Sequence, residues 1–425
     1  MNETRTSIRP QRELPGFGGQ VIRPADPGFD EGRAVFNAMI DRRPALIARC
    51  SSPDDVATAL GFAREHDLPV AVRGGGHSGG GFGVVDDGLV IDLSLLKTIE
   101  IEEDARMVRV GGGCTWGEVD RATHELGLAT PSGIISTTGV GGLTLGGGHG
   151  YLTRKYGLTI DNLLEAEVVL ANGELVRTSE DENPDLFWAL RGGGGNFGVV
   201  TSFRFRLHAV KTVVAGPVLW PIESTDEVMR WYREFLPNAP RDLYGWLGLH
   251  TVPPAPLFPE ELHLRRVAFA VFCHLGPAEQ AEEALAPVRE FGPPLFYGVQ
   301  ELPYPTLQSV FDELYCPGLQ WYWRHDFVRE LSDEAIERHV EFGRRRPTLH
   351  STMHLYPVDG AAHDVGVDET AFRYRDALWS QVIVGVDPDP ARAEELRSFA
   401  VDYWEALHPY SAGGGYVNMM MDEGG

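Results

Sequence analysis

Short apolar runs separated by glycine-rich segments characterise the first half of the chain. Leu68–Val72, Leu89–Leu93 and Met107–Val110 are rich in valine, isoleucine and leucine, and each is bounded by glycine, serine or charged residues. Apolar runs of this length are typical of buried strands. The pattern therefore predicts three buried strands that alternate with glycine-rich connections.

Helical spacing and a turn signal add further elements to this half. Apolar residues recur three or four positions apart in Pro53–His66 and Thr115–Leu126, so each segment is predicted to form a helix. Glu165–Val176 is predicted to form a hairpin, with Asn172-Gly173 at its turn. This dipeptide favours tight hairpins because both residues tolerate positive φ angles.

The composition and periodicity of the chain change near residue 208. Glycine becomes less frequent, and amphipathic helices such as Ser224–Phe235 and Pro277–Arg289 alternate with strands. The segment 411–425 is again rich in glycine. We expect an α+β fold with a first domain at 1–208, a second domain at 209–410, and a segment at 411–425 that returns to the first domain.

Composition excludes several classes of function. The chain has 425 residues and a formal net charge of −24, which disfavours nucleic acid and anionic lipid as partners. Its four cysteines, Cys50, Cys114, Cys273 and Cys316, lie far apart, so neither a disulfide scaffold nor a metal site is predicted. Met1–Pro10 is polar and no apolar run is long enough to span a membrane, so a cytoplasmic protein is expected.

The GxGxxG pattern occurs twice, at Gly74/Gly76/Gly79 and at Gly193/Gly195/Gly198. A Rossmann dinucleotide site requires a helix directly after these glycines. Neither match is followed by a helical pattern, and Val199–Phe205 alternates like a strand. The sequence therefore argues against a Rossmann fold.

Two other interpretations of the glycine segments remain open. Consecutive backbone N–H groups in Gly74–Gly79 could converge on an anion, and missing Cβ atoms would let a diphosphate approach closely. The segment could equally be a flexible connector. Thr137–Gly150 presents the same two alternatives, and two such loops could line both sides of one dinucleotide.

Five ordered motifs resemble the FAD-binding domain of the berberine-bridge-enzyme-like oxidases, within the vanillyl-alcohol-oxidase superfamily. They are the runs that begin at Arg73, Gly111, Thr138, Tyr156 and Asn183, the last ending in the RGGGGNFG sequence. The resemblance is dense over residues 30–208 and loose elsewhere. It implies a two-domain PCMH-type fold in which an antiparallel sheet of the second domain covers a flavin.

The resemblance implies that His77 carries FAD through a covalent bond to the flavin 8α-methyl group. It assigns further FAD contacts to the glycine segments and their flanks: Arg73, Gly74, Gly75, Gly76, Ser78, Gly79, Thr137, Thr138, Gly139, Gly141, Gly142, Gly148, Asn162, Gly198, Val200, Tyr416 and Asn418. Many relatives have a second link, from a cysteine just before the second glycine run. Ile135 occupies that position here, so Cys114 is not expected to bind the flavin.

The substrate side is expected on the predicted strand Leu349–Pro357, where His350, Thr352, His354 and Tyr356 share one face. In relatives a glutamate or tyrosine at the position of Tyr356 acts as the catalytic base, and His354 is the competing candidate. Tyr356 could equally be a packed strand residue without a catalytic role. Tyr416 matches a flavin-contacting tyrosine of the family, whereas Met419 replaces a second tyrosine that often takes part in catalysis.

We therefore expect hydride removal from an alcohol, a sugar, an amine or an activated ring carbon of a small molecule, with O₂ as the acceptor and H₂O₂ as product. The alternatives are a dehydrogenase with another acceptor and a noncatalytic flavin-binding protein. Thr138 takes the place of a residue that gates oxygen in relatives, and its size favours the oxidase. The resemblance also implies a longer C-terminal tail than the one that ends at Gly425.

Overall fold

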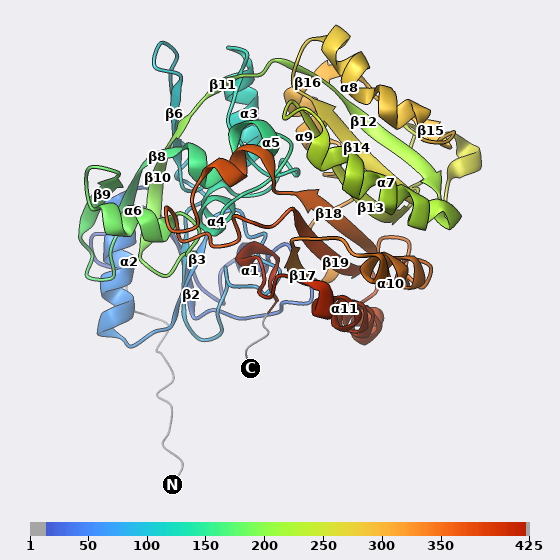
Figure 1. Cartoon of the computed structure of the whole chain (residues 1–425). Helices are drawn as coiled ribbons and strands as arrows, with labels where there is room; N and C mark the ends of the chain where they lie inside the picture. The colour runs from blue at the N-terminus through green and yellow to red at the C-terminus, as the bar shows by residue number, and fades with distance from the viewer. Residues whose placement is uncertain (1–13, 422–425) are drawn as a thin grey trace.

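The computed structural model describes residues 14–421. The polar segment Met1–Pro10 and the last four residues of the predicted return segment lie outside the described residues. Two halves follow one another along the chain: small sheets with glycine-rich connections up to residue 209, and one large sheet with helices from residue 212 (Figure 1).

The first sheet has four strands in the order β1-β2-β4-β3. Strands β2 (Leu46–Arg49), β4 (Leu89–Asp92) and β3 (Val70–Arg73) are parallel, and β1 (Gln20–Ile22) pairs antiparallel with β2. Helix α2 (Pro53–Glu65) connects β2 to β3, which lies on the far side of β4, and packs its apolar face on the sheet. Parallel strands need such a crossover, because a tight turn cannot join them. The predicted helix and the predicted strands of this region are confirmed.

The second sheet is antiparallel, in the order β5-β6-β10-β8-β9. Its strands are β5 (Ile99–Glu102), β6 (Met107–Gly111), β8 (Leu163–Val169), β9 (Leu175–Ser179) and β10 (Val199–Arg206). The β8–β9 hairpin is confirmed, with Gly173 at φ +90° in its turn. A strand, β10, begins directly after Gly198, so the argument against a Rossmann site holds. Helix α3 (Trp116–His124) matches the second predicted helix.

The large sheet of the second half is antiparallel and follows the order β15-β12-β14-β13-β18-β19-β17, with β16 paired to β12. Its strands are β12 (Thr212–Pro221), β13 (Leu243–Thr251), β14 (Arg266–His274), β15 (Phe296–Tyr297), β16 (Gln300–Pro303), β17 (Gln320–Val328), β18 (Thr352–Pro357) and β19 (Trp379–Asp387). A two-stranded ladder of β7 (Leu128–Ala129) and β11 (His208–Ala209) precedes it.

Four helices cover one face of this sheet (Figure 1). They are α7 (Thr225–Asn238), α8 (Ala278–Glu290), α10 (Asp333–Gly343) and α11 (Ala393–Leu407). Along β13, Leu247 and Leu249 point to the helices, whereas Trp246 belongs to the core on the other face, as strand alternation requires. Every residue of β13 is buried, so both faces of the sheet are covered.

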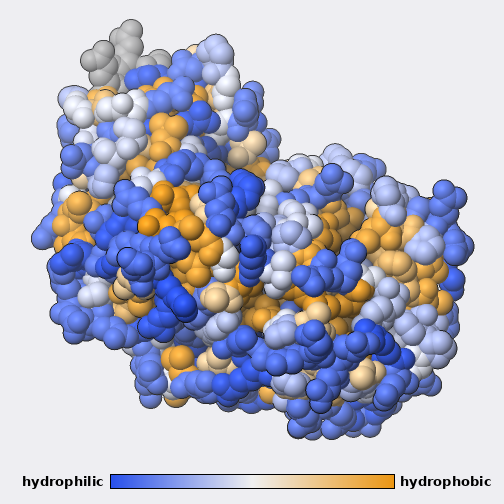
Figure 2. Space-filling model, turned by 90° about the horizontal axis from the view of Figure 1, so that it is seen from above, coloured by the Kyte–Doolittle hydropathy of each residue, from blue (hydrophilic) through white to orange (hydrophobic). Residues whose placement is uncertain are grey.

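The remaining helices are short: α1 (Phe29–Arg33), α4 (Val140–Gly146), α5 (Thr153–Tyr156), α6 (Pro184–Leu190) and α9 (Tyr304–Ser309). The described residues contain no helix with the length and apolar character needed to cross a bilayer. Viewed from above, the surface is mostly hydrophilic, and its larger hydrophobic areas lie towards the hollowed middle of the face (Figure 2).

Three local expectations were wrong. The glycine run after Thr138 is not only a loop, because 140–146 forms α4, whose Val140 and Thr144 are buried against the core. That burial outweighs a helix penalty of roughly 1 kcal/mol for each glycine. Strand β3 is not fully buried: Val70 and Val72 are exposed because they face a cavity. Strand β18 begins at Thr352, so His350 lies before it and does not share its face.

Candidate active site

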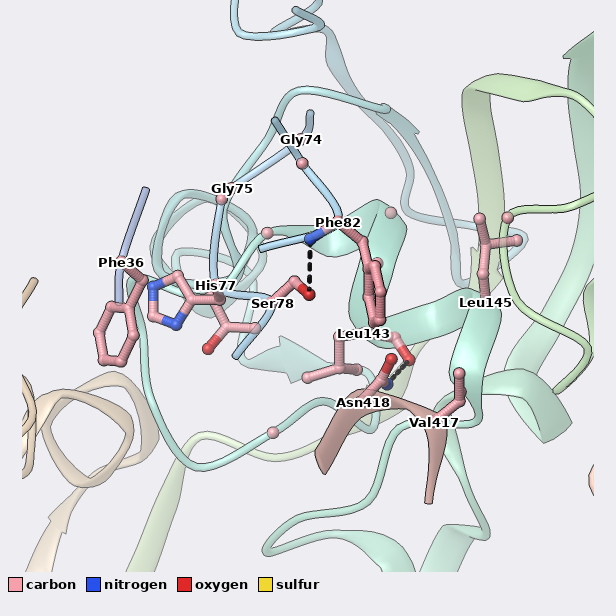
Figure 3. Close-up of a pocket in the computed structure, with 18 of the residues that line it drawn as sticks. Phe36, Gly74, Gly75, His77, Ser78, Phe82, Leu143, Leu145, Val417 and Asn418 are labelled. Carbon is pink, nitrogen blue, oxygen red and sulfur yellow. Dashed lines mark hydrogen bonds between the residues drawn. The ribbon is translucent and has the colours of Figure 1, made fainter. Parts of the chain in front are cut away.

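A cavity of about 710 Å³ lies between the glycine segments of the first half and the large sheet of the second half. This volume is within the usual range of cofactor and ligand pockets, roughly 300–1,000 Å³. The loop after β3, the segment leading into α4, and strands β17, β18 and β19 supply its walls. Residues 417–419, far along the chain, close one side of it beside Leu143 (Figure 3).

His77 lies on the glycine loop after β3 and its ring stacks on Phe36, with ring centroids 4.3 Å apart (Figure 3). Thr137 Oγ1 is 3.1 Å from His77 Nε2. This contact engages Nε2, so Nδ1 is the ring nitrogen that remains to react. Burial lowers the pKa of His77 to about 4, so the imidazole is neutral and carries a lone pair near pH 7.

The same loop offers the backbone groups that a diphosphate needs. Within the described residues, the N–H groups of 74–78 donate no hydrogen bond to the protein. Arg73 is not a free phosphate ligand, because its guanidinium donates to Asp92 at 2.6 Å and to the carbonyl oxygen of Ala34. Val70 and Val72 add an apolar surface beside the loop. Unpaired N–H donors next to apolar walls fit a dinucleotide such as FAD.

The opposite wall carries a hydrogen-bonded pair of titratable side chains. His354 and Tyr356 are alternate residues of β18, so both face the cavity. His354 Nδ1 lies 2.6 Å from the Tyr356 hydroxyl, and His354 Nε2 lies 3.3 Å from the hydroxyl of Tyr315. Burial lowers the pKa of His354 well below its usual value and raises that of Tyr356 well above it. Both side chains are therefore neutral at pH 7.

Tyr416 also lines the cavity, and its phenol oxygen accepts two hydrogen bonds. The donors are the backbone N–H of Gly148 at 2.8 Å and Asn418 Nδ2 at 2.9 Å. Burial raises the pKa of Tyr416 to about 12, although both donors oppose this effect. Tyr416 is thus held in place from two sides with its own hydroxyl proton uncommitted to any partner among the described residues.

The structure brings most of the predicted site residues to this cavity, but four do not line it. Thr137 instead contacts His77, because its hydroxyl hydrogen-bonds to Nε2 of that ring. Gly79 packs directly under Trp323, where an added Cβ would lie 2.1 Å from the indole ring. Gly148 holds the Tyr416 hydroxyl. Asn162 is buried, and its amide donates to the carbonyl oxygen of Leu158 and also pairs with His208, which leaves little for a cofactor.

Other lining residues were not predicted from the sequence. Trp321 and Trp323 are alternate residues of β17 that face the cavity, a periodicity visible in the sequence although nothing local indicates which face the cavity occupies. Tyr315 and His149 come from irregular segments and carry no recognisable signal. His149 is joined to β19 through Ser380 Oγ, 3.0 Å from its Nε2.

The cysteine that could be mistaken for a flavin ligand lies outside the cavity. Cys114 is fully buried, and its Sγ lies 3.6 Å from the carbonyl oxygen of Thr98. Burial raises the pKa of this thiol to about 11, so it is not a reactive thiolate. Ile135, at the position where relatives are expected to carry their cysteine, does line the cavity.

Comparison with known proteins supports this interpretation of the cavity. A family model for the FAD binding domain matches residues 44–179. These include the glycine loop 74–79 that carries His77, here called the His77 loop, and the segment leading into α4. The chain is 32% identical to an FAD-linked oxidoreductase of Dictyostelium discoideum, over 89% of this chain and 81% of the relative. It is also 32% identical to (R)-6-hydroxynicotine oxidase of Paenarthrobacter nicotinovorans, over 89% of this chain and 83% of the relative.

A solved structure of an oxidase has a similar fold. Glucooligosaccharide oxidase of Acremonium strictum superposes with a TM-score of 0.84 at 25% identity, covering 95% of this chain and 88% of that one. Its FAD is described as linked both through cysteine to position 6 and through histidine at the 8α position. The two halves of the present chain are therefore arranged as in a flavin oxidase.

Proposed function

We propose that this chain, which belongs to the berberine-bridge-enzyme-like FAD-linked oxidoreductases, oxidises a neutral aromatic small molecule and passes the electrons to O₂ with formation of H₂O₂. The observation that carries the proposal is the His354–Tyr356 pair, which places a proton-accepting group on the cavity wall opposite the His77 loop. In this proposal the residues up to 208 and the return segment from residue 411 form the FAD domain, and residues 209–410 form the substrate domain.

FAD fits the cavity and would be held by the free N–H groups of 74–78, by the glycine segment at 139–142, and covalently by His77. Thr137 engages Nε2 of His77, so Nδ1 is the atom proposed to bond to the flavin. The neutral state of the imidazole supports this role, because only an unprotonated nitrogen is a nucleophile. A histidyl link in a relative with the same fold is consistent with it.

When bound, FAD supplies the acceptor for the hydride that leaves the substrate carbon. The protein must remove the proton of the neighbouring O–H or N–H group. We assign this step to Tyr356, whose hydroxyl shares its proton with His354. Tyr416, whose hydroxyl is held by Gly148 and Asn418, would contact the flavin ring and could donate its hydroxyl proton to it.

The walls around this pair indicate which substrate class would bind. Among the described lining residues Arg73 is the one with a permanent charge, and it is paired with Asp92. Trp321, Trp323 and Ile135 supply flat or apolar surface. A cavity without a free charge and rich in aromatic side chains favours an uncharged aromatic alcohol or a similarly activated ring over a sugar, which needs many polar partners.

Anaerobic mixing of the purified holoprotein with three probes tests the proposal. Benzyl-type alcohols should bleach the visible flavin absorption, whereas a cello-oligosaccharide and a charged alkylamine should not. Readmission of air should restore the absorption and release H₂O₂. Bleaching by the oligosaccharide alone would show that the proposed substrate class is wrong. If neither these probes nor any fraction of a cell extract reduced the flavin, a noncatalytic flavin-binding protein would be favoured.

A further inference from the structure

The His354–Tyr356 pair is one end of a longer hydrogen-bonded chain that leads away from the cavity. Beyond His354, the Tyr315 hydroxyl lies 3.2 Å from Nε2 of His250, on the neighbouring strand β13. His250 Nδ1 in turn lies 2.5 Å from the backbone carbonyl oxygen of Thr251. All four side chains are buried, so no bulk water competes for these bonds.

The backbone at the far end fixes the direction of the chain. A carbonyl oxygen can only accept, so His250 must carry its proton on Nδ1 and present a lone pair at Nε2. Tyr315 donates to that lone pair, and its own oxygen then accepts from Nε2–H of His354. This leaves Nδ1 of His354 as an acceptor, and Tyr356 is the donor to it.

The opposite direction makes one bond fewer. If His354 donated from Nδ1 to Tyr356, its Nε2 would need the proton of Tyr315, and Nε2 of His250 would lose its donor. A buried acceptor without a partner is unfavourable, so the chain that makes all four bonds is preferred. Burial lowers the pKa of His250 to about 4, in agreement with the neutral ring that the chain requires.

The ladder between β13 and β18 makes room for this arrangement. Gly248 is paired with His354, and an added Cβ at Gly248 would lie 3.0 Å from Cδ2 of the His354 ring. Trp246, on the same face of β13, also contacts the ring, with centroids 4.6 Å apart. The imidazole is thus held by packing as well as by hydrogen bonds, and its tautomer is set by Tyr315 and His250.

We infer that Tyr315 and His250 are positioning residues that keep Tyr356 oriented as a donor to His354, so that the Tyr356 oxygen faces the cavity as a proton acceptor. The site then selects substrates that carry an O–H or N–H donor beside the carbon to be oxidised. The substrate proton would pass to the Tyr356 oxygen while the Tyr356 proton passes to Nδ1 of His354. The C–H hydrogen would leave with both bonding electrons to the bound cofactor, whose added negative charge would balance the positive charge on the buried His354 ring.

This inference rests on the proposed function for its substrate step, but the tautomer can be measured without turnover. In ¹⁵N-histidine-labelled holoprotein, His354 should show the Nε2–H tautomer, with the peak assigned by its loss in His354→Gln. Tyr315→Phe removes the hydroxyl that accepts from Nε2–H and should abolish that preference. Tyr244→Phe is the matched control, because the Tyr244 hydroxyl is buried and has no partner among the described residues. An Nδ1–H tautomer of His354 in the wild type would overturn the inference.

The rate of flavin reduction provides the second readout. Tyr315→Phe should slow reduction by benzyl alcohol about 10- to 10³-fold with little change in KM, since a wrong histidine tautomer can cost up to about 10⁴-fold in a related arrangement. Tyr244→Phe should react as the wild type does, and benzyl methyl ether, which lacks the O–H group, should not reduce the wild type. Equal rates for the two tyrosine variants, or reduction by the ether, would contradict the inference. Failure of every alcohol to react, with the Nε2–H tautomer present, would count against the proposed function alone.

Discussion

Gly75 and Gly139 lie backbone against backbone, and neither position has room for a side chain. A Cβ added to Gly75 would lie 2.4 Å from the backbone nitrogen of Gly139, and one added to Gly139 would lie 2.3 Å from that of Gly75. The two glycine segments, more than sixty residues apart in the sequence, therefore meet directly at the cavity wall. This contact positions the His77 loop relative to the segment that carries Thr137 and Thr138.

Gly139→Ala is predicted to destabilise the protein and to weaken FAD incorporation, because the methyl group must separate the two segments. Overpacking of this kind costs about 1–3 kcal/mol. Gly61→Ala is the matched control: Gly61 lies within α2, and no atom of the described residues is within 4 Å of an added Cβ, so the change should stabilise the helix by roughly 0.5–1 kcal/mol. Thermal unfolding and the flavin-to-protein absorbance ratio measure both effects, and equal melting temperatures would contradict the prediction.

The flavin is predicted to remain attached to denatured protein through His77. After acid precipitation the wild-type pellet should be yellow, whereas His77→Ala should release its flavin to the supernatant or bind none. Cys114→Ala should keep the colour in the pellet, since the thiol is buried against the carbonyl oxygens of Leu96 and Thr98 rather than in the cavity. A colourless wild-type pellet would rule out the covalent bond.

Tyr356→Phe is predicted to slow flavin reduction by about 10²–10⁴-fold, the usual contribution of general-base catalysis. Binding should change less, because the ring itself is retained. Tyr416→Phe provides the comparison: it removes the hydroxyl that Gly148 and Asn418 hold, and should alter the visible flavin spectrum as well as the rate. Stopped-flow reduction under anaerobic conditions separates the two, and near wild-type reduction by Tyr356→Phe would place the base elsewhere.

The elements that could be predicted from the sequence are those with a local cause. The Asn172-Gly173 turn follows from backbone preferences, whereas the strand after Gly198 and helix α2 follow from their periodicity. Helix α4 could not be predicted, because tertiary burial of Val140 overrides its glycine content. Tyr315 could not be found either: it precedes β17, and only the folding of the large sheet brings it to His354 on β18.

Acid is predicted to destabilise the fold partly through His339. This side chain is buried, its Nδ1 pairs with the Tyr403 hydroxyl, and burial lowers its pKa to about 3. The unfolded chain binds a proton below about pH 6.5 while the folded chain does not, so the free energy of unfolding falls as pH decreases from 6.5 towards 3. The loss amounts to about 2 kcal/mol at pH 5, at about 1.4 kcal/mol per pH unit.

His339→Gln removes this contribution. The free energy of unfolding by urea, measured at pH 8 and at pH 5, should therefore decline less in the variant than in the wild type, by about 2 kcal/mol. The variant is expected to be the less stable protein at pH 8, because it disturbs the bond to Tyr403. The same decline in both proteins would show that His339 is protonated in the folded state.

Thr138 is predicted to admit oxygen to the reduced flavin. Its side chain lines the cavity on the segment that Gly139 holds against the His77 loop, and no hydrogen bond of its hydroxyl to another described residue restricts it. Threonine is close to valine in volume, so we expect an open path and reoxidation within seconds in air-saturated buffer. Thr138→Leu adds bulk at the same place and should slow reoxidation strongly, while Thr138→Val should not. Stopped-flow mixing of the reduced enzyme with oxygen measures all three. Reoxidation of the wild type over many minutes would favour a dehydrogenase that uses another acceptor.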